Sequence, residues 1–110
     1  MDKRKRRIAL NEAVFREANE ALSSLQGPQG EARLLDLLCE CGNPDCVDKI
    51  EMSIEAYEWL RADPARFALV SGHEQPDVET IIQRHQRYDV VEKHAGESER
   101  VAKATNPRSN

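Results

Sequence analysis

The sequence predicts a small α+β fold, and three patterns in its 110 residues point to it. Residues 3–26 have the spacing of one long helix, short apolar segments after residue 33 are typical of strands, and all three cysteines lie within residues 39–46. We expect a long N-terminal helix, a small antiparallel sheet, one short helix after Ser53, and a zinc knuckle at one edge of the sheet. The expected parts are a basic N-terminus with the long helix (1–26), a small α+β zinc-binding domain (31–94) and a disordered tail (95–110).

The long helix is predicted by a stripe of mostly apolar residues that recur at alternating spacings of three and four. Gly27 suits the C′ position and Pro28 bars continuation, so the helix should end near Gln26. We expect the stripe to pack on the domain. The alternative is a protruding helix that docks on a partner or on a second copy, where Asn11 would make any pairing register-specific. The stripe consists of Ile8, Asn11, Phe15, Ala18, Leu22 and Leu25.

Residues 33–41 fit either a strand or a short helix, and a strand that enters the cysteine loop is the favoured interpretation. Lys49–Met52 alternate polar and apolar side chains, which predicts a strand with Ile50 and Met52 facing inward. Ser53 is the expected N-cap of the short helix.

Pro64 should end this short helix, because the residue before a proline avoids helical geometry. Residues 67–70 predict a third strand. Residues 78–84 and 88–93 are interpreted as a hairpin, although the first of these segments also fits a helical turn. From Ala95 onward no apolar period remains, so a disordered tail is expected.

The cysteine cluster predicts a zinc site. Cys39, Cys41 and Cys46 supply three thiolates from one loop, and zinc takes tetrahedral sulfur and nitrogen ligands. His73 is the expected fourth ligand, because it follows a predicted strand and a glycine that lets the backbone turn closely. His85 and His94 are the rival candidates.

Four protein ligands leave no position for water or substrate, so the expected site is structural and not catalytic. Asp45 or Glu74 could orient a ligand by a hydrogen bond, although a surface carboxylate is the simpler role for both. The sequence has no Gly-rich phosphate loop, G-x-S-x-G or H-E-x-x-H motif, so we expect no enzymatic activity.

Three other interpretations of the cysteines remain open. A thiol redox switch would pair Cys46 with Cys39 or Cys41, because cysteines two residues apart form strained bridges. The three residues could also be unrelated buried thiols. An iron–sulfur cluster usually needs four cysteines, and this chain has three.

Charge is unevenly distributed along the chain. Residues 1–7 hold five basic residues and one acidic residue, a net charge of +4, whereas residues 8–110 hold 11 basic and 19 acidic residues, a net charge of −8. The acidic body argues against non-specific nucleic-acid binding by the folded domain, whereas Lys3–Arg7 could contact phosphates or form a solvated terminus. No apolar run is long enough to span a bilayer and no secretory signal follows the basic start, so a cytoplasmic protein with reduced thiols is expected.

Several short patterns occur together between about residue 8 and residue 93. They are Asn11-Glu12…Phe15-Arg16…Asn19-Glu20, Cys39-Glu40-Cys41-Gly42, Tyr57…Arg61-Ala62-Asp63-Pro64…Phe67, Gly72-His73-Glu74 and Val90-Val91-Glu92-Lys93. As a set, these patterns resemble a group of short bacterial proteins of unassigned function. The resemblance implies that the cysteines and histidine form a metal site, but it implies no activity and no partner.

The function that the sequence favours is a non-catalytic, zinc-stabilised interaction or regulatory module that binds another protein through the N-terminal helix. The alternatives are a nucleic-acid-associated regulator that uses Lys3–Arg7, and a thiol redox sensor.

Overall fold

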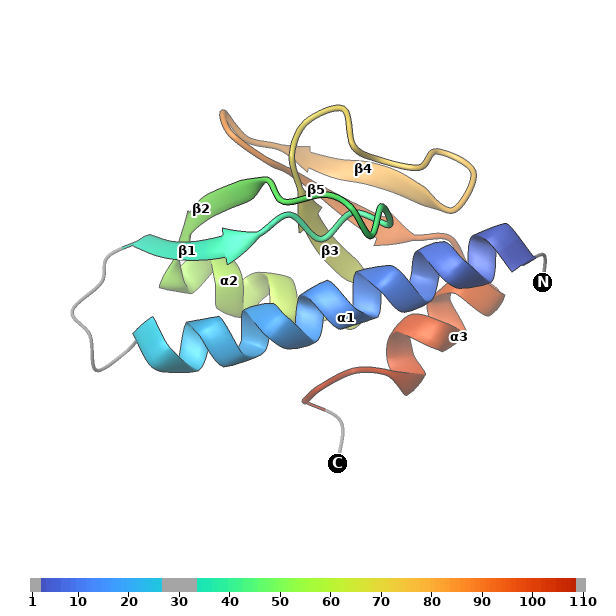
Figure 1. Cartoon of the computed structure of the whole chain (residues 1–110), viewed down its shortest axis with the longest axis horizontal. Helices are drawn as coiled ribbons and strands as arrows, with labels where there is room; N and C mark the ends of the chain where they lie inside the picture. The colour runs from blue at the N-terminus through green and yellow to red at the C-terminus, as the bar shows by residue number, and fades with distance from the viewer. Residues whose placement is uncertain (1–2, 27–33, 109–110) are drawn as a thin grey trace.

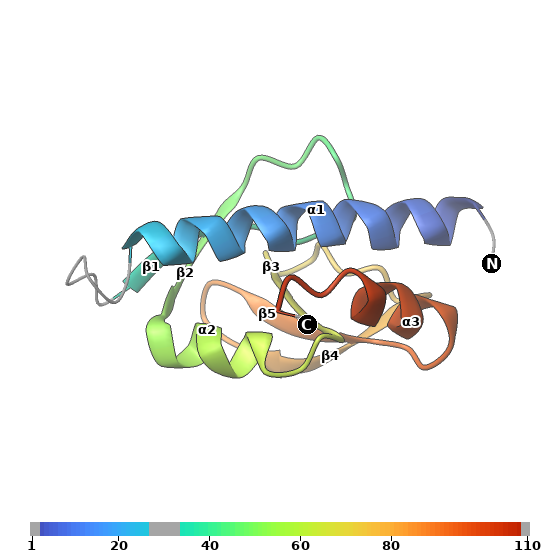
Figure 2. The same ribbon diagram turned by 90° about the horizontal axis from the view of Figure 1, so that it is seen from below.

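The protein has the expected α+β architecture in a computed structural model that describes residues 3–26 and 34–108 (Figure 1). The long helix α1 runs along the whole molecule, with β1 and β2 beside its C-terminal half and α3 beside its N-terminal half (Figures 1 and 2). The predicted end of α1 at Gly27 and Pro28 lies outside the described residues. The elements are α1 (Lys3–Gln26), β1 (Leu34–Leu38), β2 (Lys49–Ser53), α2 (Ile54–Arg61), β3 (Arg66–Leu69), β4 (Glu79–Arg84), β5 (Asp89–Lys93) and α3 (Glu97–Ala104).

The predicted strands are all present, but they are divided over two antiparallel sheets rather than one. β1 pairs with β2, and the other sheet has the order β3-β5-β4. The segment after β1 lies along β3 without continuing a regular ladder: the Glu40 amide donates to the Ala68 carbonyl at 2.8 Å, and the Val70 amide donates to the Cys39 sulfur at 3.2 Å. The cysteine loop therefore joins the two sheets.

Local signals for α2 and for the β4–β5 hairpin are confirmed. The Ser53 hydroxyl accepts a hydrogen bond from the Ala56 amide at 3.0 Å, as an N-cap should. β4 and β5 pair in antiparallel register from Glu79 opposite Lys93 to Arg84 opposite Asp89, which excludes the helical alternative for this segment. Ile50 and Met52 are buried as predicted.

The apolar core has two clusters on either side of the joined sheets. One contains no cysteine and is formed by β1, β2, α2 and parts of β3 and β5. The other contains Cys39 and Cys41 together with residues of β3, β5 and α3. The members of the first cluster are Leu35, Leu37, Ile50, Met52, Tyr57, Leu60, Ala68, Tyr88 and Val90, and those of the second are Cys39, Cys41, Phe67, Leu69, Val91 and Ala102.

The face of α1 that packs on the domain coincides only in part with the predicted apolar stripe: Ile8 is buried and Leu22 packs against the first core cluster. Leu25, a member of the stripe, is 80% exposed, and Leu10 and Val14 beside it also lie on the solvent side. The apolar packing of this helix is therefore incomplete, because most of the large side chains that α1 buries are polar or charged and have partners far away in the sequence. The buried residues of α1 are Ile8, Ala9, Glu12, Ala13, Arg16 and Asn19.

The outer edge of β1 is covered by two carboxamide side chains of α1. Asn19 accepts from the Leu38 amide at 2.7 Å and donates to the Leu38 carbonyl at 2.8 Å. Gln26 accepts from the Asp36 amide and donates to the Asp36 carbonyl, both at 2.9 Å. Each side chain thus satisfies the outward-facing backbone groups of one strand residue, as a neighbouring strand would.

A buried charge cluster joins α1 to the second sheet. The Lys93 ammonium donates to Glu12 at 2.5 Å and to Glu79 at 3.1 Å, and all three side chains are at most 1% exposed. Burial raises the pKa of the Glu12 carboxyl well above its ordinary value, and the adjacent Glu79 carboxylate raises the same pKa further. The buried cluster therefore favours the neutral, protonated form of Glu12.

We expect Glu12→Gln to change how stability depends on pH. Because the pKa of Glu12 is raised in the folded state, protonation of Glu12 stabilises the fold. This contribution to the free energy of unfolding is complete below the unfolded-state pKa and is lost as pH rises through the folded-state pKa. Glutamine keeps the shape and cannot ionise. The free energy of unfolding of the wild type, from urea titrations between about pH 5 and 8 with metal in excess, should therefore fall relative to the variant by up to about 1.4 kcal/mol per pH unit. Parallel curves would contradict this, and Glu17→Gln, at an exposed position of α1, is the control.

The C-terminal segment is a correction to the sequence prediction, because residues 97–104 form α3 where a disordered tail was expected. An isolated helix of this length is unstable in water, so α3 depends on tertiary contacts. The buried Arg16 guanidinium donates to the Ala102 carbonyl at 2.8 Å and to the Thr105 hydroxyl at 3.0 Å. Beyond α3, Arg108 forms a bidentate ion pair with Glu58 at 3.0 and 2.8 Å. These partners are far apart in the sequence, so a local sequence pattern does not predict the helix that they stabilise.

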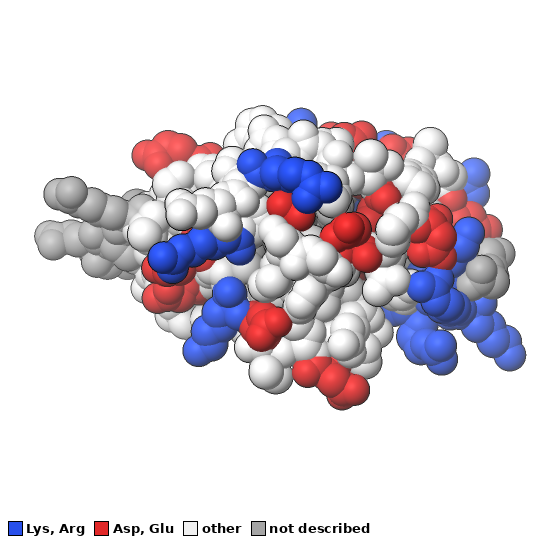
Figure 3. Space-filling view, turned by 90° about the horizontal axis from the view of Figure 1, so that it is seen from above, with Lys and Arg blue, Asp and Glu red and all other residues white. Residues whose placement is uncertain are grey.

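The basic N-terminus begins α1 directly. Lys and Arg side chains gather at the end of the molecule where α1 begins (Figure 3). Arg4 pairs with Asp77 and donates to the Gln75 side chain at 3.0 Å, so the first turn is attached to the segment before β4. None of the helices in the described part of the chain is long and apolar enough to cross a membrane.

Candidate metal centre

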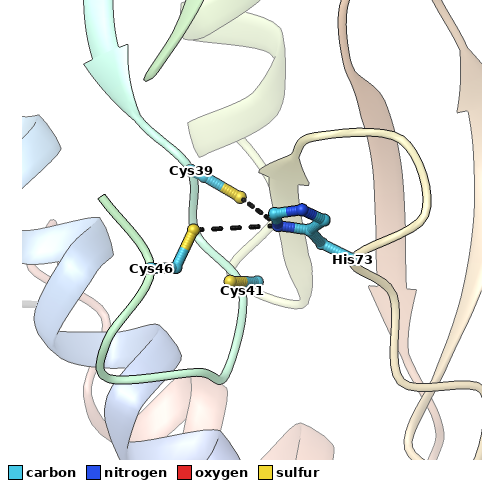
Figure 4. A group of neighbouring side chains, drawn as sticks. All are labelled: Cys39, Cys41, Cys46 and His73. Carbon is cyan, nitrogen blue, oxygen red and sulfur yellow. Dashed lines mark hydrogen bonds between the residues drawn. The ribbon is translucent and has the colours of Figure 1, made fainter. Parts of the chain in front are cut away.

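The four predicted ligands come together in one cluster. The ligand atoms of Cys39, Cys41, Cys46 and His73 all lie within 4.8 Å of one another. The cysteines belong to the loop between β1 and β2, and the His73 ring, from the segment after β3, faces them (Figure 4). These side chains are positioned to bind a metal ion.

The distances suit tetrahedral coordination. The His73 Nδ1 atom lies 3.5 Å from the Cys39 sulfur and 3.7 Å from the Cys46 sulfur. Zinc bonds of about 2.3 Å to sulfur and about 2.0–2.1 Å to nitrogen, at tetrahedral angles, place such atoms about 3.6 Å apart. These two distances therefore match those that a zinc ion between the three atoms would require.

The rival histidines lie elsewhere. The His85 ring stacks on Tyr88, with 4.4 Å between ring centroids, and its Nε2 atom contacts the Gln83 side chain at 2.9 Å. The His94 Nε2 atom contacts the Thr80 hydroxyl at 2.9 Å. Within the described residues, His73 is the histidine that joins the cysteine cluster.

The loop geometry follows from the residues between the cysteines. The Asn43 side chain accepts a hydrogen bond from the Asp45 amide at 2.9 Å, and the Asn43 backbone carbonyl accepts one from the Cys46 amide at 3.1 Å. This turn, which contains Pro44, brings Cys46 back toward Cys39. The Cys39 amide donates to the Asp48 carbonyl at 3.0 Å and closes the loop.

Each sulfur also accepts a backbone hydrogen bond. The Val70 amide donates to Cys39, the Asn43 amide to Cys41, and the Asp48 amide to Cys46. Amide donors stabilise the thiolate form, which is the form that binds metals.

The position of His73 depends on the tight turn before it. The His73 amide donates to the Val70 carbonyl at 3.0 Å, and Gly72 has a φ of 92°, a left-handed conformation that side chains other than glycine adopt at a cost. With Nδ1 toward the sulfurs, Nε2 lies 3.6 Å from the Asp48 carboxylate. The carboxylate beside the histidine is thus Asp48 rather than Asp45 or Glu74, for which a surface role was the simpler expectation, and such a partner fixes ring orientation in metal sites.

The charges of the cluster require a cation if all three cysteines are to ionise. A hydrogen bond from the Cys39 side chain lowers the pKa of Cys41 to about 5, and the same contact, together with burial, raises the pKa of Cys39. Burial also raises the pKa of Cys46. The protein groups alone favour one thiolate, since like charges repel at these distances; a divalent cation stabilises the other two.

Glu40, between two of the cysteines, is the residue whose role the sequence did not reveal. It is fully buried and forms a bidentate ion pair with Arg61 of α2 at 2.7 and 2.8 Å. It also accepts from the Asn19 side chain at 2.8 Å and from the Ala68 amide at 3.1 Å. The Glu40 carboxylate therefore connects the cysteine loop to α1, α2 and β3 through hydrogen bonds and an ion pair.

A signal for this role is present in the sequence. If Cys39 and Cys41 face the metal in an extended segment, then Glu40 must face the opposite way, toward the protein interior. On α1, Glu12, Arg16 and Asn19 recur at spacings of four and three, which is helical periodicity formed by polar residues. Both patterns become evident only when polar side chains are allowed into the core.

Comparison of the chain with protein-family models, with curated proteins and with solved structures found no match. The resemblance to short bacterial proteins therefore stays a prediction, and the assignment of function depends on the residues of this chain.

Proposed function

We propose that this protein is a zinc-stabilised, non-catalytic module that binds another protein through α1. The observation that carries the proposal is the convergence of three sulfurs and one imidazole nitrogen within 4.8 Å. Zinc suits this donor set, because soft thiolates with an imidazole in a tetrahedral arrangement are typical of its structural sites. Four protein ligands fill the tetrahedron, so the site serves stability rather than catalysis.

The solvent face of α1 supports a protein partner. Leu10 and Val14 are 42% and 65% exposed on a helix that the domain holds in place through its other face. Exposed apolar side chains on a fixed helix are typical of helix-mediated recognition. A photo-cross-linking residue at position 14 should capture this partner in cells, whereas the same residue at exposed Gln86 should not. Equal yields at both positions would refute the assignment of this face.

The nucleic-acid alternative has weaker support. Arg4 is already paired with Asp77, and the rest of the domain carries a net charge of −8, which opposes phosphate contacts beyond the first turns of α1. We place the module in the cytoplasm, where free thiols stay reduced and available to a metal ion.

Metal analysis tests the zinc site. The untagged protein, purified without added chelator, should contain one zinc ion per chain. His73→Ala should lower zinc affinity by at least about tenfold, because one ligand and its contact with Asp48 are lost. The matched control is His85→Ala, which removes a histidine outside the cluster and should leave zinc content unchanged. A wild type without stoichiometric zinc, or equal affinities in both variants, would refute the site.

A further inference from the structure

We propose that residues 38–42, the metal-binding ribbon, pass the state of the metal site to α1, so that α1 stays in its observed position only while the metal is bound. The inference rests on the proposed function, because it needs an ion held by Cys39 and Cys41. It adds a route by which that site regulates the rest of the molecule.

The ribbon has two faces with different tasks. Cys39 and Cys41 turn toward His73, whereas Glu40 between them turns toward α1 and α2. Successive residues of an extended segment point in opposite directions, so ligands and α1 contacts alternate along the ribbon. An ion that fixes the odd-numbered positions therefore also fixes the even-numbered ones.

α1 contacts all three even-numbered positions. The Asn19 side chain donates to the Leu38 carbonyl and to the Glu40 carboxylate, both at 2.8 Å. The Asn11 side chain donates to the Gly42 carbonyl at 3.1 Å. A Cβ atom added to Gly42 would lie 2.4 Å from the Ile8 side chain, so the helix and the ribbon are in direct contact.

These contacts make the packing of α1 on the domain sensitive to small displacements of the ribbon. The large polar side chains that α1 buries are Glu12, Arg16 and Asn19, and they act through hydrogen bonds and ion pairs. Such bonds weaken steeply outside a narrow range of distance and angle, whereas apolar contacts tolerate sliding. Without an ion, no coordination bonds hold Cys39 and Cys41 to Cys46 and His73, so the ribbon and the positions that Asn11 and Asn19 contact are free to shift.

Release of α1 would uncover a defined part of the domain. Asn19 and Gln26 cover the outward-facing amides and carbonyls of Leu38 and Asp36 at the edge of β1. The amide protons of these two residues therefore report whether α1 is seated, independently of the helix itself.

Hydrogen exchange of the full chain tests the proposal. We compare the zinc-loaded protein with the same protein after chelation and read the amides of α1, of Asp36 and Leu38, and of the β4–β5 hairpin. Chelation should speed exchange in α1 and at both β1 amides by roughly tenfold or more relative to the hairpin, whose strands pair with each other and with β3. An equal change in all three regions, or no change in α1, would overturn the proposal.

A variant that leaves the ligands untouched separates the two faces of the ribbon. Gly42→Ala should force Ile8 and α1 away and speed exchange in α1 while zinc content stays at one per chain. Asp45→Ala, at an exposed position of the same loop, should change neither quantity. Unchanged exchange in Gly42→Ala would contradict the contact. Absence of zinc from the wild type would instead refute the proposed function, and zinc binding without coupling to α1 would refute this inference alone.

Discussion

Removal of the metal ion is expected to lower the free energy of unfolding by several kcal/mol. Structural zinc binds zinc-finger peptides with about 10–16 kcal/mol, and a small domain is stable by only about 5–15 kcal/mol. Cys39 and Cys41 belong to the second apolar cluster, so loss of the ion disturbs packing as well as coordination. The first cluster contains no ligand and should keep part of the strands and α2 in place.

Urea unfolding followed by circular dichroism measures this effect. The midpoint should fall after chelation and return when zinc is added back in slight excess. Cys46→Ser, which lacks one ligand, should be less stable than the wild type and should respond less to both treatments. Superimposable curves for the zinc-loaded and chelated wild type would exclude a structural role for the ion.

Loss of the Glu40 charge is the second large effect that we expect. Glu40→Gln keeps the size of the side chain but leaves the Arg61 guanidinium, 1% exposed, without a carboxylate. Breaking a buried ion pair on one side costs about 3–5 kcal/mol, because the remaining charge stays desolvated. This loss is a large part of the about 5–15 kcal/mol by which a small domain is stable. The variant should therefore unfold at a markedly lower urea concentration with metal in excess.

The chain offers a matched control for this experiment. Glu58 and Arg108 form the same kind of bidentate pair, but Glu58 is 55% exposed, and solvent-exposed pairs contribute about 1 kcal/mol or less. Glu58→Gln should therefore change stability little. Adding Arg61→Met to Glu40→Gln should recover part of the loss by removing the unpaired charge. Equal effects of the two glutamate variants, or no recovery in the double variant, would show that charge burial is not the cause.

Local patterns predicted much of the fold and of the candidate site. The helical period of α1, the strands and the Ser53 cap depend on neighbouring residues, and the cysteines and His73 differ in chemistry from their surroundings. The division into two sheets, the polar seat of α1 and the existence of α3 depend on pairs far apart in sequence, such as Arg16 with Ala102. Single-sequence periodicity treats buried charge as surface, and this is why those features were missed.

The two carboxamides that cover the edge of β1 have a consequence for biosynthesis. Leu34–Leu38 contain four leucines, and an open apolar strand of this kind is prone to recruit other chains into aggregates. Asn19 and Gln26 precede the strand in the chain, so the ribosome synthesises the two covering side chains before it synthesises β1. The order of synthesis thereby makes both carboxamides available before the strand that they cover has been made.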